Sequence, residues 1–241
     1  MKKKKHAATV WKGIGCVVFL FIALFPIYWL AAMSIRLTDE MKGHISVIPH
    51  SFTLEHFAQL FEREGFGQAI LNSAQTTLGS LVISLLVGIC AAYVIARRRF
   101  RFGFKQPMTY WVLLVRVLPP VAFVIPLYIM FNQLGLINTK VPVMLACVLI
   151  NVPLIIWFLL SFFQELPEEV EESAKMDGAT EWQLFRKIVL PLVAPGIAAV
   201  AMLSFMYAWN EYTYTVIFTR SSTNNTVPLA LALLNTEDNL T

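Results

Sequence analysis

The segment VPVMLACVLINVPLIIWFLLSFF, residues 141–163, contains no charged side chain. A membrane-spanning α-helix needs about 20 consecutive apolar residues, so this segment is long enough to cross a lipid bilayer. Because the hydrocarbon offers the backbone no water to bond with, a span of this kind is expected to be helical. The segment therefore predicts a helical integral membrane protein.

Four further segments, to either side of this one, have the same character. They are residues 13–35, 70–96, 108–131 and 188–218, of which the last two carry one charge each, Arg116 and Glu211. The whole chain is 57% hydrophobic and only 14% charged, whereas soluble domains are about 25% charged. A core of this size cannot absorb so much apolar surface, so lipid must cover the rest. We expect an all-α, polytopic transmembrane helix bundle with five spans.

The distribution of Lys and Arg predicts how the spans are oriented. With the N-terminus inside, the inner segments hold thirteen basic residues and the outer segments five. The inner ones lie in residues 2–5, 12, 97–105, 175 and 186–187, and the outer ones are Arg36, Lys42, Arg63, Lys140 and Arg220. This asymmetry predicts a cytoplasmic basic N-terminus, residues 1–12, followed by a membrane domain, residues 13–241. Residues 13–35 are too long for the apolar core of a typical cleaved signal peptide, which favours a retained span.

The cytoplasmic loop 164–190 is the most charged stretch between spans. Pro167 suits a first helical turn, and Asp177-Gly178 is a typical helix end. Thr180 with Gln183 forms a capping box that begins a second helix, which Pro191 closes. On this second helix Trp182, Phe185 and Val189 share one stripe, which predicts an exposed aromatic surface. Such a surface either binds a partner or packs on the protein's own helices, and the pattern alone favours neither.

The same loop carries a recognisable motif. Two runs resemble the EAA loop of ABC importer permeases: Glu172-Ser173-Ala174-Lys175-Met176-Asp177-Gly178-Ala179 and, separated from Gly178 by nine residues, Ile188-Val189-Leu190-Pro191. The departure is Ser173, where Ala is usual. The resemblance implies that a short helix of the loop docks on a cytoplasmic ATPase and moves with it. The residues expected to couple to the ATPase are Glu172, Ala174, Asp177, Gly178, Ala179, Trp182 and Phe185.

Other stretches look like the sugar-uptake branch of that family, the maltose- and trehalose-type permeases. They are Leu118-Pro119-Pro120, Leu134-Gly135-Leu136, Leu166-Pro167-Glu168-Glu169 and Trp209-Asn210-Glu211-Tyr212. The resemblance implies a type I ABC importer permease fold in the bacterial inner membrane, normally with six spans, against the five expected in residues 1–241. It also implies a partner ATPase dimer that binds ATP and Mg, a second homologous permease and an extracytoplasmic solute-binding protein.

Polar residues within the spans are candidates for a solute pathway. They are Asn151, Tyr207, Asn210, Glu211 and Tyr212. Aromatic faces with hydrogen-bonding groups suit a sugar, although an interfacial aromatic belt with a structural carboxylate has the same composition. Asn151 equally suits a bond between helices, and Arg116 suits a side chain that reaches back to the interface. Pro119, Pro120 and Pro126 are expected to kink their span.

The polar outer segment 219–226 is a candidate contact for the binding protein. By resemblance its residues Ser221, Ser222, Thr223 and Asn224 probe that partner, while the alternative is a plain solvated loop. The outer histidines His44, His50 and His56 are expected to be solvated. Cys16, Cys90 and Cys147 are far apart within apolar segments and show no metal-ligand spacing.

The chain contains no GxxxxGK[ST], GxSxG or HExxH motif, so no catalytic residues, metal or cofactor are expected in it, and ATP belongs to another subunit. Its basic residues follow the pattern of membrane topology, which argues against a nucleic-acid partner. Three alternatives remain beside a sugar permease. They are a permease for another small polar solute, a secondary transporter that works alone, and a non-transporting membrane docking protein. A lone transporter is expected to show inverted repeats, and none is apparent.

Overall fold

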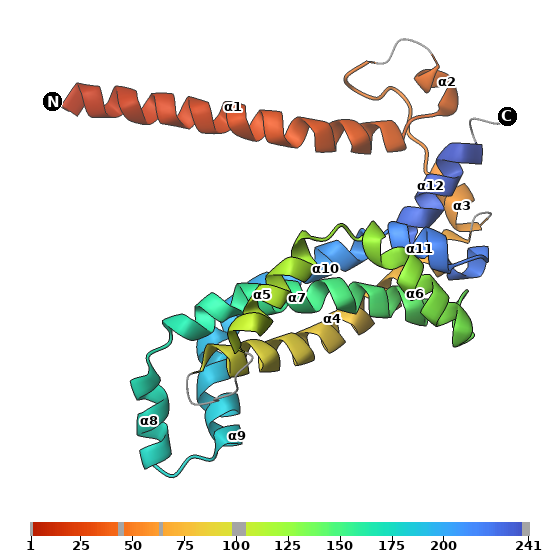
Figure 1. The fold of residues 1–241 in the computed structure, drawn as a ribbon. Helices are drawn as coiled ribbons and strands as arrows, with labels where there is room; N and C mark the ends of the chain where they lie inside the picture. The colour runs from red at the N-terminus through yellow and green to blue at the C-terminus, as the bar shows by residue number, and fades with distance from the viewer. Residues whose placement is uncertain (1, 43–45, 63–64, 98–104, 238–241) are drawn as a thin grey trace. The chain divides into compact units, whose positions relative to one another are not determined.

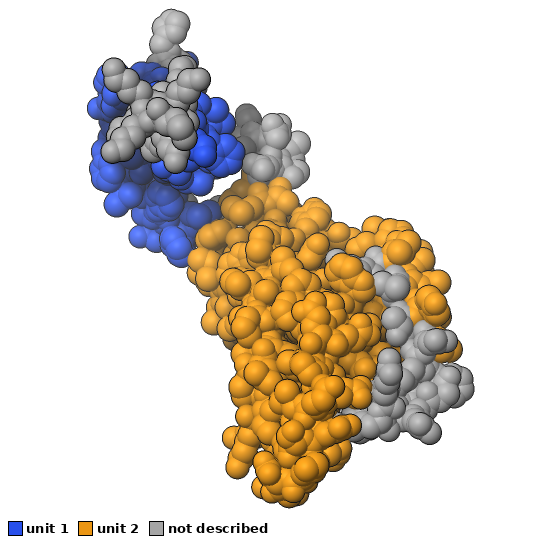
Figure 2. Space-filling model, turned by 90° about the vertical axis from the view of Figure 1, so that its left-hand side faces the viewer, with its two compact units in different colours: residues 1–65 blue, residues 66–241 orange. Residues whose placement is uncertain are grey.

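The computed structural model describes residues 2–42, 46–62, 65–97 and 105–237, and all regular elements in these ranges are helical (Figure 1). Two compact units, Met1–Gly65 and Phe66–Thr241, are coloured separately in Figure 2. The first unit contains α1 (Lys2–Ser34), α2 (Thr38–Met41) and α3 (Glu55–Glu62). The second unit contains α4 (Phe66–Ala96), α5 (Lys105–Val117), α6 (Val121–Gln133), α7 (Lys140–Glu165), α8 (Glu168–Met176), α9 (Glu181–Leu184), a π-helical turn η1 (Phe185–Val189), α10 (Leu190–Trp209), α11 (Thr213–Phe218), a 3₁₀ turn η2 (Ser222–Asn224) and α12 (Val227–Glu237).

Four helices in the described part of the chain are long and apolar enough to cross a membrane. They are Lys12–Ser34, Phe66–Ala96, Lys140–Glu165 and Glu181–Trp209. The first three begin within a few residues of the predicted starting residues. The last begins at Glu181, earlier than the predicted residue 188. The prediction of a helical, polytopic membrane protein is confirmed.

The predicted span 108–131 is not one helix. Residues 118–120 separate α5 from α6, each of which is 13 residues long. Pro119 and Pro120 lack the backbone N–H that a continuing helix needs, and each ring opposes the carbonyl four residues earlier. Two adjacent prolines therefore break the helix, where a kink was expected.

The predicted span 188–218 also differs from the structure in two places. Pro191 does not close the loop's second helix, because α9, η1 and α10 form one helix from Glu181 to Trp209. The wider π-helical turn lies immediately before Pro191, where a proline ring would crowd the carbonyl four residues back in a regular α-helix. At the other end the helix stops at Trp209, and α11 begins afresh at Thr213.

The core of the second unit lies between α4, α7 and α10, which run side by side in Figure 1. Small residues on α4 and α10 bring these helices close to α7. A Cβ at Gly88 would lie 2.6 Å from the Ile155 side chain, and one at Gly196 would lie 2.7 Å from Phe162. Close backbone approach at small residues is the usual way in which membrane helices pack.

The polar segment 219–226 is followed by a further apolar helix, which was not predicted from the sequence. The run Val-Pro-Leu-Ala-Leu-Ala-Leu-Leu at residues 227–234 forms most of α12, which packs against α4 and buries Leu229. This run is too short to meet the length criterion for a span, so hydropathy alone missed it.

In the first unit the loop after α1 is ordered by polar contacts. Arg36 is buried, lies 5.6 Å from the centre of the Trp29 ring and forms an ion pair with Glu40 at 3.7 Å. Hydrogen bonds from the Ser51 side chain and the His50 backbone hold the pKa of Glu40 below its usual value. His56 is half-buried, and its Nε2 lies 2.8 Å from the Arg36 carbonyl, so it is not simply solvated as predicted. His44 lies outside the described residues.

Candidate functional site

The loop after α7 folds into two short helices at one end of the second unit (Figure 1). Helix α8 begins at Glu168, with Pro167 as its extended N-cap, so the proline precedes the first turn. Gly178 has a φ of +85°, which a residue without a side chain adopts at little cost, and it ends the helix as predicted. The predicted capping box is present, with Gln183 N donating to Thr180 Oγ1 at 3.3 Å and Thr180 N donating to Gln183 Oε1 at 2.9 Å.

The predicted exposed aromatic stripe on the second helix is wrong. Trp182 is 65% exposed, but Phe185 is only 9% exposed and Val189 is fully buried. The Phe185 ring lies 4.9 Å from that of Tyr93 on α4. Because the second helix continues into α10, its inner face packs against the bundle, and of the three stripe residues Trp182 alone is exposed.

The motif residues also divide into exposed and buried ones. Glu172, Asp177 and Gly178 are exposed, Ala179 is half-buried and Ala174 is buried. Met176, which sequence reasoning did not single out, is the most exposed large apolar side chain of the loop. The surface that the loop offers therefore consists of Glu172, Met176, Asp177, Gly178 and Trp182, and we call it the loop knob.

A buried charged cluster, which was not predicted, lies beneath the loop knob. Arg97, at the end of α4, is 3% exposed, and Glu171, on α8, is 4% exposed. The Arg97 Nε lies 2.6 Å from Glu171 Oε1, and Tyr93 donates its hydroxyl to Glu171 Oε2 at 3.3 Å. Arg97 Nη1 also donates to the Leu166 carbonyl at 3.2 Å. The sequence showed Arg97 only as part of a basic cluster that sets topology.

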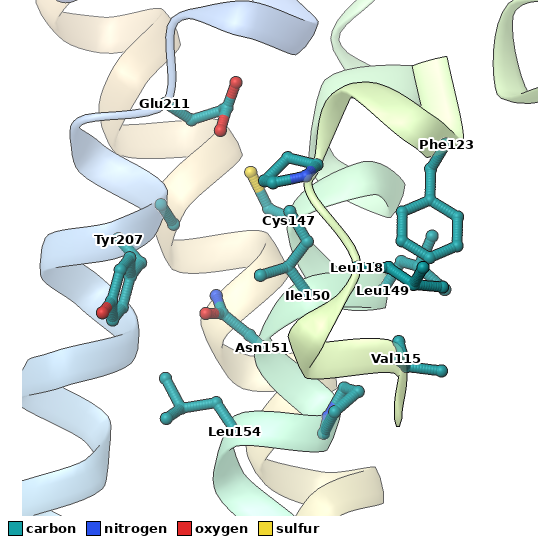
Figure 3. A pocket seen from close by; sticks show the side chains of 13 residues that line it. Val115, Leu118, Phe123, Cys147, Leu149, Ile150, Asn151, Leu154, Tyr207 and Glu211 are labelled. Atoms are coloured by element: carbon teal, nitrogen blue, oxygen red, sulfur yellow. The ribbon is translucent and has the colours of Figure 1, made fainter. Parts of the chain in front are cut away.

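The second unit contains a cavity of about 250 Å³, and Figure 3 shows the side chains that line it. Its lining comes from the break between α5 and α6, from α7 and from the end of α10, and includes Leu118, Phe123, Cys147, Asn151, Tyr207 and Glu211. Three of the five predicted pathway residues, Asn151, Tyr207 and Glu211, therefore share one cavity. Asn210 and Tyr212 are not part of its lining.

The polar groups of the cavity also have structural bonds. The Glu211 Oε1 accepts the Tyr214 backbone N–H at 2.7 Å and so caps α11, which begins after the break at residue 210. The Asn151 Nδ2 donates to the Ser204 carbonyl at 3.3 Å and joins α7 to α10, while its buried Oδ1 has no hydrogen-bond partner among the described residues. Arg116 lies in α5, and its side chain is outside the described residues.

The outer segment 219–226 is an ordered turn. Asn72, buried on α4, donates from Nδ2 to the carbonyls of Thr223 at 2.8 Å and Asn225 at 2.9 Å. The Oδ1 of Asn138, the residue with φ +67°, accepts the backbone N–H groups of Arg220 and Ser221, both at 2.9 Å. Within this turn Ser222 and Thr223 remain exposed, whereas Ser221 and Asn224 are half-buried.

Long apolar helices, a folded loop projecting from one end of the bundle and a partly polar cavity within it define a polytopic membrane transport subunit. Residues 84–240 match the family described as binding-protein-dependent transport system inner membrane component, and the chain belongs to this family. It is a permease subunit of the ABC importer type, which confirms the resemblance seen in the motif.

Named relatives cover most of the chain. The trehalose transport system permease protein SugB of Mycobacterium tuberculosis is 34% identical over 93% of this chain and 81% of its own. The diacetylchitobiose uptake system permease protein DasC of Streptomyces coelicolor is 30% identical over 97% of this chain and 84% of its own. A bacterial ABC transporter that imports the acidic polysaccharide alginate has the same fold, with a TM-score of 0.78 at 21% identity, covering 99% of this chain and 82% of that one.

Proposed function

We propose that this permease forms part of the translocation pathway for a sugar or sugar-like solute and that its loop knob couples the pathway to a separate ATPase. The observation that carries the coupling role is the loop itself. Its second helix begins with a capping box, the chain turns between the two helices at the positive-φ Gly178, and Trp182 is left exposed. An aromatic side chain presented in this way is typical of the residues that dominate protein interfaces.

The remaining assembly follows from this role. The ATPase is a dimer that binds ATP and Mg, and a second homologous permease completes the membrane domain. The outer turn 219–226, through Ser221, Ser222, Thr223 and Asn224, faces a solute-binding protein, and a solved relative is a complex with a periplasmic protein that carries an alginate pentasaccharide. The excess of basic residues in the inner segments supports a cytoplasmic N-terminus and loop in a bacterial inner membrane.

The cavity supports a sugar as the solute. Tyr207 offers an aromatic face, Glu211 offers a carboxylate, and Asn151 has an acceptor oxygen that no group in the described part of the chain bonds. Sugars need both apolar stacking surfaces and hydrogen-bonding groups, and such mixed lining is typical of their sites. Relatives named for trehalose, diacetylchitobiose and arabinooligosaccharides fit the same class.

The coupling role is tested with Trp182→Ala in the complete transporter. Trp111, on α5, is also 65% exposed, so Trp111→Ala is a matched control for the loss of an exposed tryptophan. We expect Trp182→Ala to reduce the amount of ATPase that co-purifies with the permease, and Trp111→Ala to leave it unchanged. Equal ATPase binding by both variants and wild type would remove the loop knob from the interface. Phe185→Ala is unsuitable here because Phe185 belongs to the core.

The pathway role is tested with Glu211→Gln. Glutamine keeps an oxygen that can accept the Tyr214 N–H, so the cap on α11 survives while the charge is lost. We expect uptake of labelled disaccharide into proteoliposomes to fall while the ATPase stays bound. Competition with unlabelled sugars and amino acids identifies the solute class, and competition by amino acids alone would overturn the choice of a sugar.

A further inference from the structure

Helix α8 is joined to the bundle by non-helical main chain on both sides. Helix α7 ends at Glu165, and Leu166 and Pro167 are extended, with ψ of 123° and 134°. At its other end α8 meets the turn at Asp177 and Gly178. A helix between two such connections can tilt by small changes of backbone angle, so its orientation must be fixed by side-chain contacts.

The Arg97–Glu171 pair provides this contact. The pair joins Glu171 of α8 to Arg97, the residue that directly follows α4. Arg97 also donates to the carbonyl of Leu166, which lies in the connection between α7 and α8. The Tyr93 ring lies 5.9 Å from the Arg97 guanidinium carbon, and it packs against Phe163 of α7 at 5.5 Å and Phe185 at 4.9 Å. One cluster therefore connects α4, α7, α8 and the second loop helix.

The chemistry of the cluster points to orientation more than to stability. Removing two charges from water has a large cost, and well-packed apolar residues are often at least as stabilising at such a position. The hydrogen bonds around the ion pair are directional, in contrast, because Tyr93 donates its hydroxyl to Glu171 Oε2 at 3.3 Å and Arg97 Nη1 donates to the Leu166 carbonyl at 3.2 Å. Together with the ion pair they select one geometry. An Arg–Glu pair buried under a projecting loop is thus suited to hold that loop at a defined angle.

We propose that Arg97 and Glu171 are positioning residues that make the loop knob move together with α4. A displacement of the loop by the ATPase then reaches α4 directly and is not absorbed by bending at Leu166 and Pro167. Helix α4 has 31 residues and a length of about 45 Å, and near its other end Asn72 holds the outer turn through Thr223 and Asn225. The pair therefore links the loop knob to a rigid helix that also supports the outer turn. This inference rests on the proposed coupling function.

The test uses the complete transporter in proteoliposomes and measures solute uptake per ATP hydrolysed. Glu171→Gln removes the charge and keeps the shape, and Glu168→Gln, an exposed residue on the same helix, is the matched control. We expect Glu171→Gln to lower uptake per ATP about 5-fold or more while ATP hydrolysis continues, and the control to equal wild type. A purely structural role would reduce the amount of assembled transporter and leave this ratio unchanged.

A double-mutant cycle decides whether the two residues act as a pair. The double variant Arg97→Gln/Glu171→Gln should lower solute uptake per ATP hydrolysed no further than either single change. A double variant whose fold-loss equals the product of the two single losses would contradict the pairing. If the Glu171→Gln transporter does not assemble, Tyr93→Phe decides, because it removes only the hydroxyl bonded to Glu171. A Glu171→Gln or Tyr93→Phe transporter with the wild-type ratio overturns the proposal. A wild-type chain that binds no ATPase overturns the proposed function instead.

Discussion

The two ends of the second unit are held together by different chemistry. Beneath the loop knob, a buried guanidinium and carboxylate meet at 2.6 Å. At the other end, the turn at residues 219–226 is held by the neutral amides of Asn72 and Asn138, which bond backbone groups at 2.8–2.9 Å. A buried charge without its partner is much more costly than an amide without one.

This difference suits two kinds of contact. The loop has one strongly preferred orientation, because any tilt that separates Arg97 from Glu171 breaks a contact between two buried charges. The turn at residues 219–226 is held by neutral amide bonds, each of which costs less to lose. The contact beneath the loop knob therefore fixes the loop's orientation more strongly than the amides fix the turn at the other end.

The largest predicted effect is that of Arg97→Ala. Loss of the guanidinium breaks the buried ion pair with Glu171, so the free energy of unfolding should fall by about 3–5 kcal/mol. Denaturant unfolding in mild detergent measures this change. If the free energy of unfolding fell by only about 0–1 kcal/mol, as expected for an exposed ion pair, water would have to reach Glu171. The two ends of the second unit would then not differ in chemistry.

A smaller effect is expected for Asn72→Ala at the outer end. The change leaves the carbonyls of Thr223 and Asn225 without this donor, and the free energy of unfolding should fall by about 1–3 kcal/mol. Gln68→Ala is the control, because its exposed side chain loses one bond to Asn72 and no contact with the turn. Comparable losses for Asn72→Ala and Arg97→Ala would remove the contrast between the two ends.

Gly178→Val is expected to strain the backbone of the loop. No atom lies within 4 Å of the site of an added Cβ, so the effect comes from the positive φ alone, with a cost of about 1–2 kcal/mol. The reoriented second helix should also reduce uptake per ATP. Gly178→Asn, which adopts positive φ more readily, should behave nearly as wild type. Equal defects in both variants would indicate that the side chain collides with the ATPase.

The smallest effect is expected for Lys175→Ala. Lys175 and Glu181 form an ion pair at 2.5 Å between the two loop helices, but both side chains are exposed. Exposed pairs contribute about 0–1 kcal/mol, so unfolding and uptake should change little. A defect as large as that of Glu171→Gln would show that the exposed pair, and not the buried one, orients the loop.

The parts of the loop that were predicted correctly depend on neighbouring residues. The capping box of Thr180 and Gln183 and the helix end at Gly178 need only a few residues to be recognised. The burial of Phe185 and the pairing of Glu171 depend on α4, which is far away in the sequence. A helical stripe does not reveal which partner covers it, and a count of basic residues does not reveal that one of them turns inward.

The same distinction explains the rest of the second unit. The apolar segments predicted the long helices, because length and hydropathy determine whether a segment can span a bilayer. The break at residues 118–120 and the cap that Glu211 provides for α11 concern how a helix stops within the membrane, which hydropathy does not report. Of the pathway candidates, Asn151, Tyr207 and Glu211 meet only because the breaks after α5 and α10 lie near each other in the fold.

The π-helical turn at Phe185–Val189 fixes the rotational phase between the loop and the span. Each residue of an α-helix turns the chain by about 100°, so deletion of one residue here would rotate Trp182 by about a quarter-turn relative to α10. The embedded part of α10 would be unaffected by such a deletion, and the chain would still enter the bilayer. The length of this short stretch therefore determines the direction in which the loop points, and a homologue with a different length here would present its loop in a different direction.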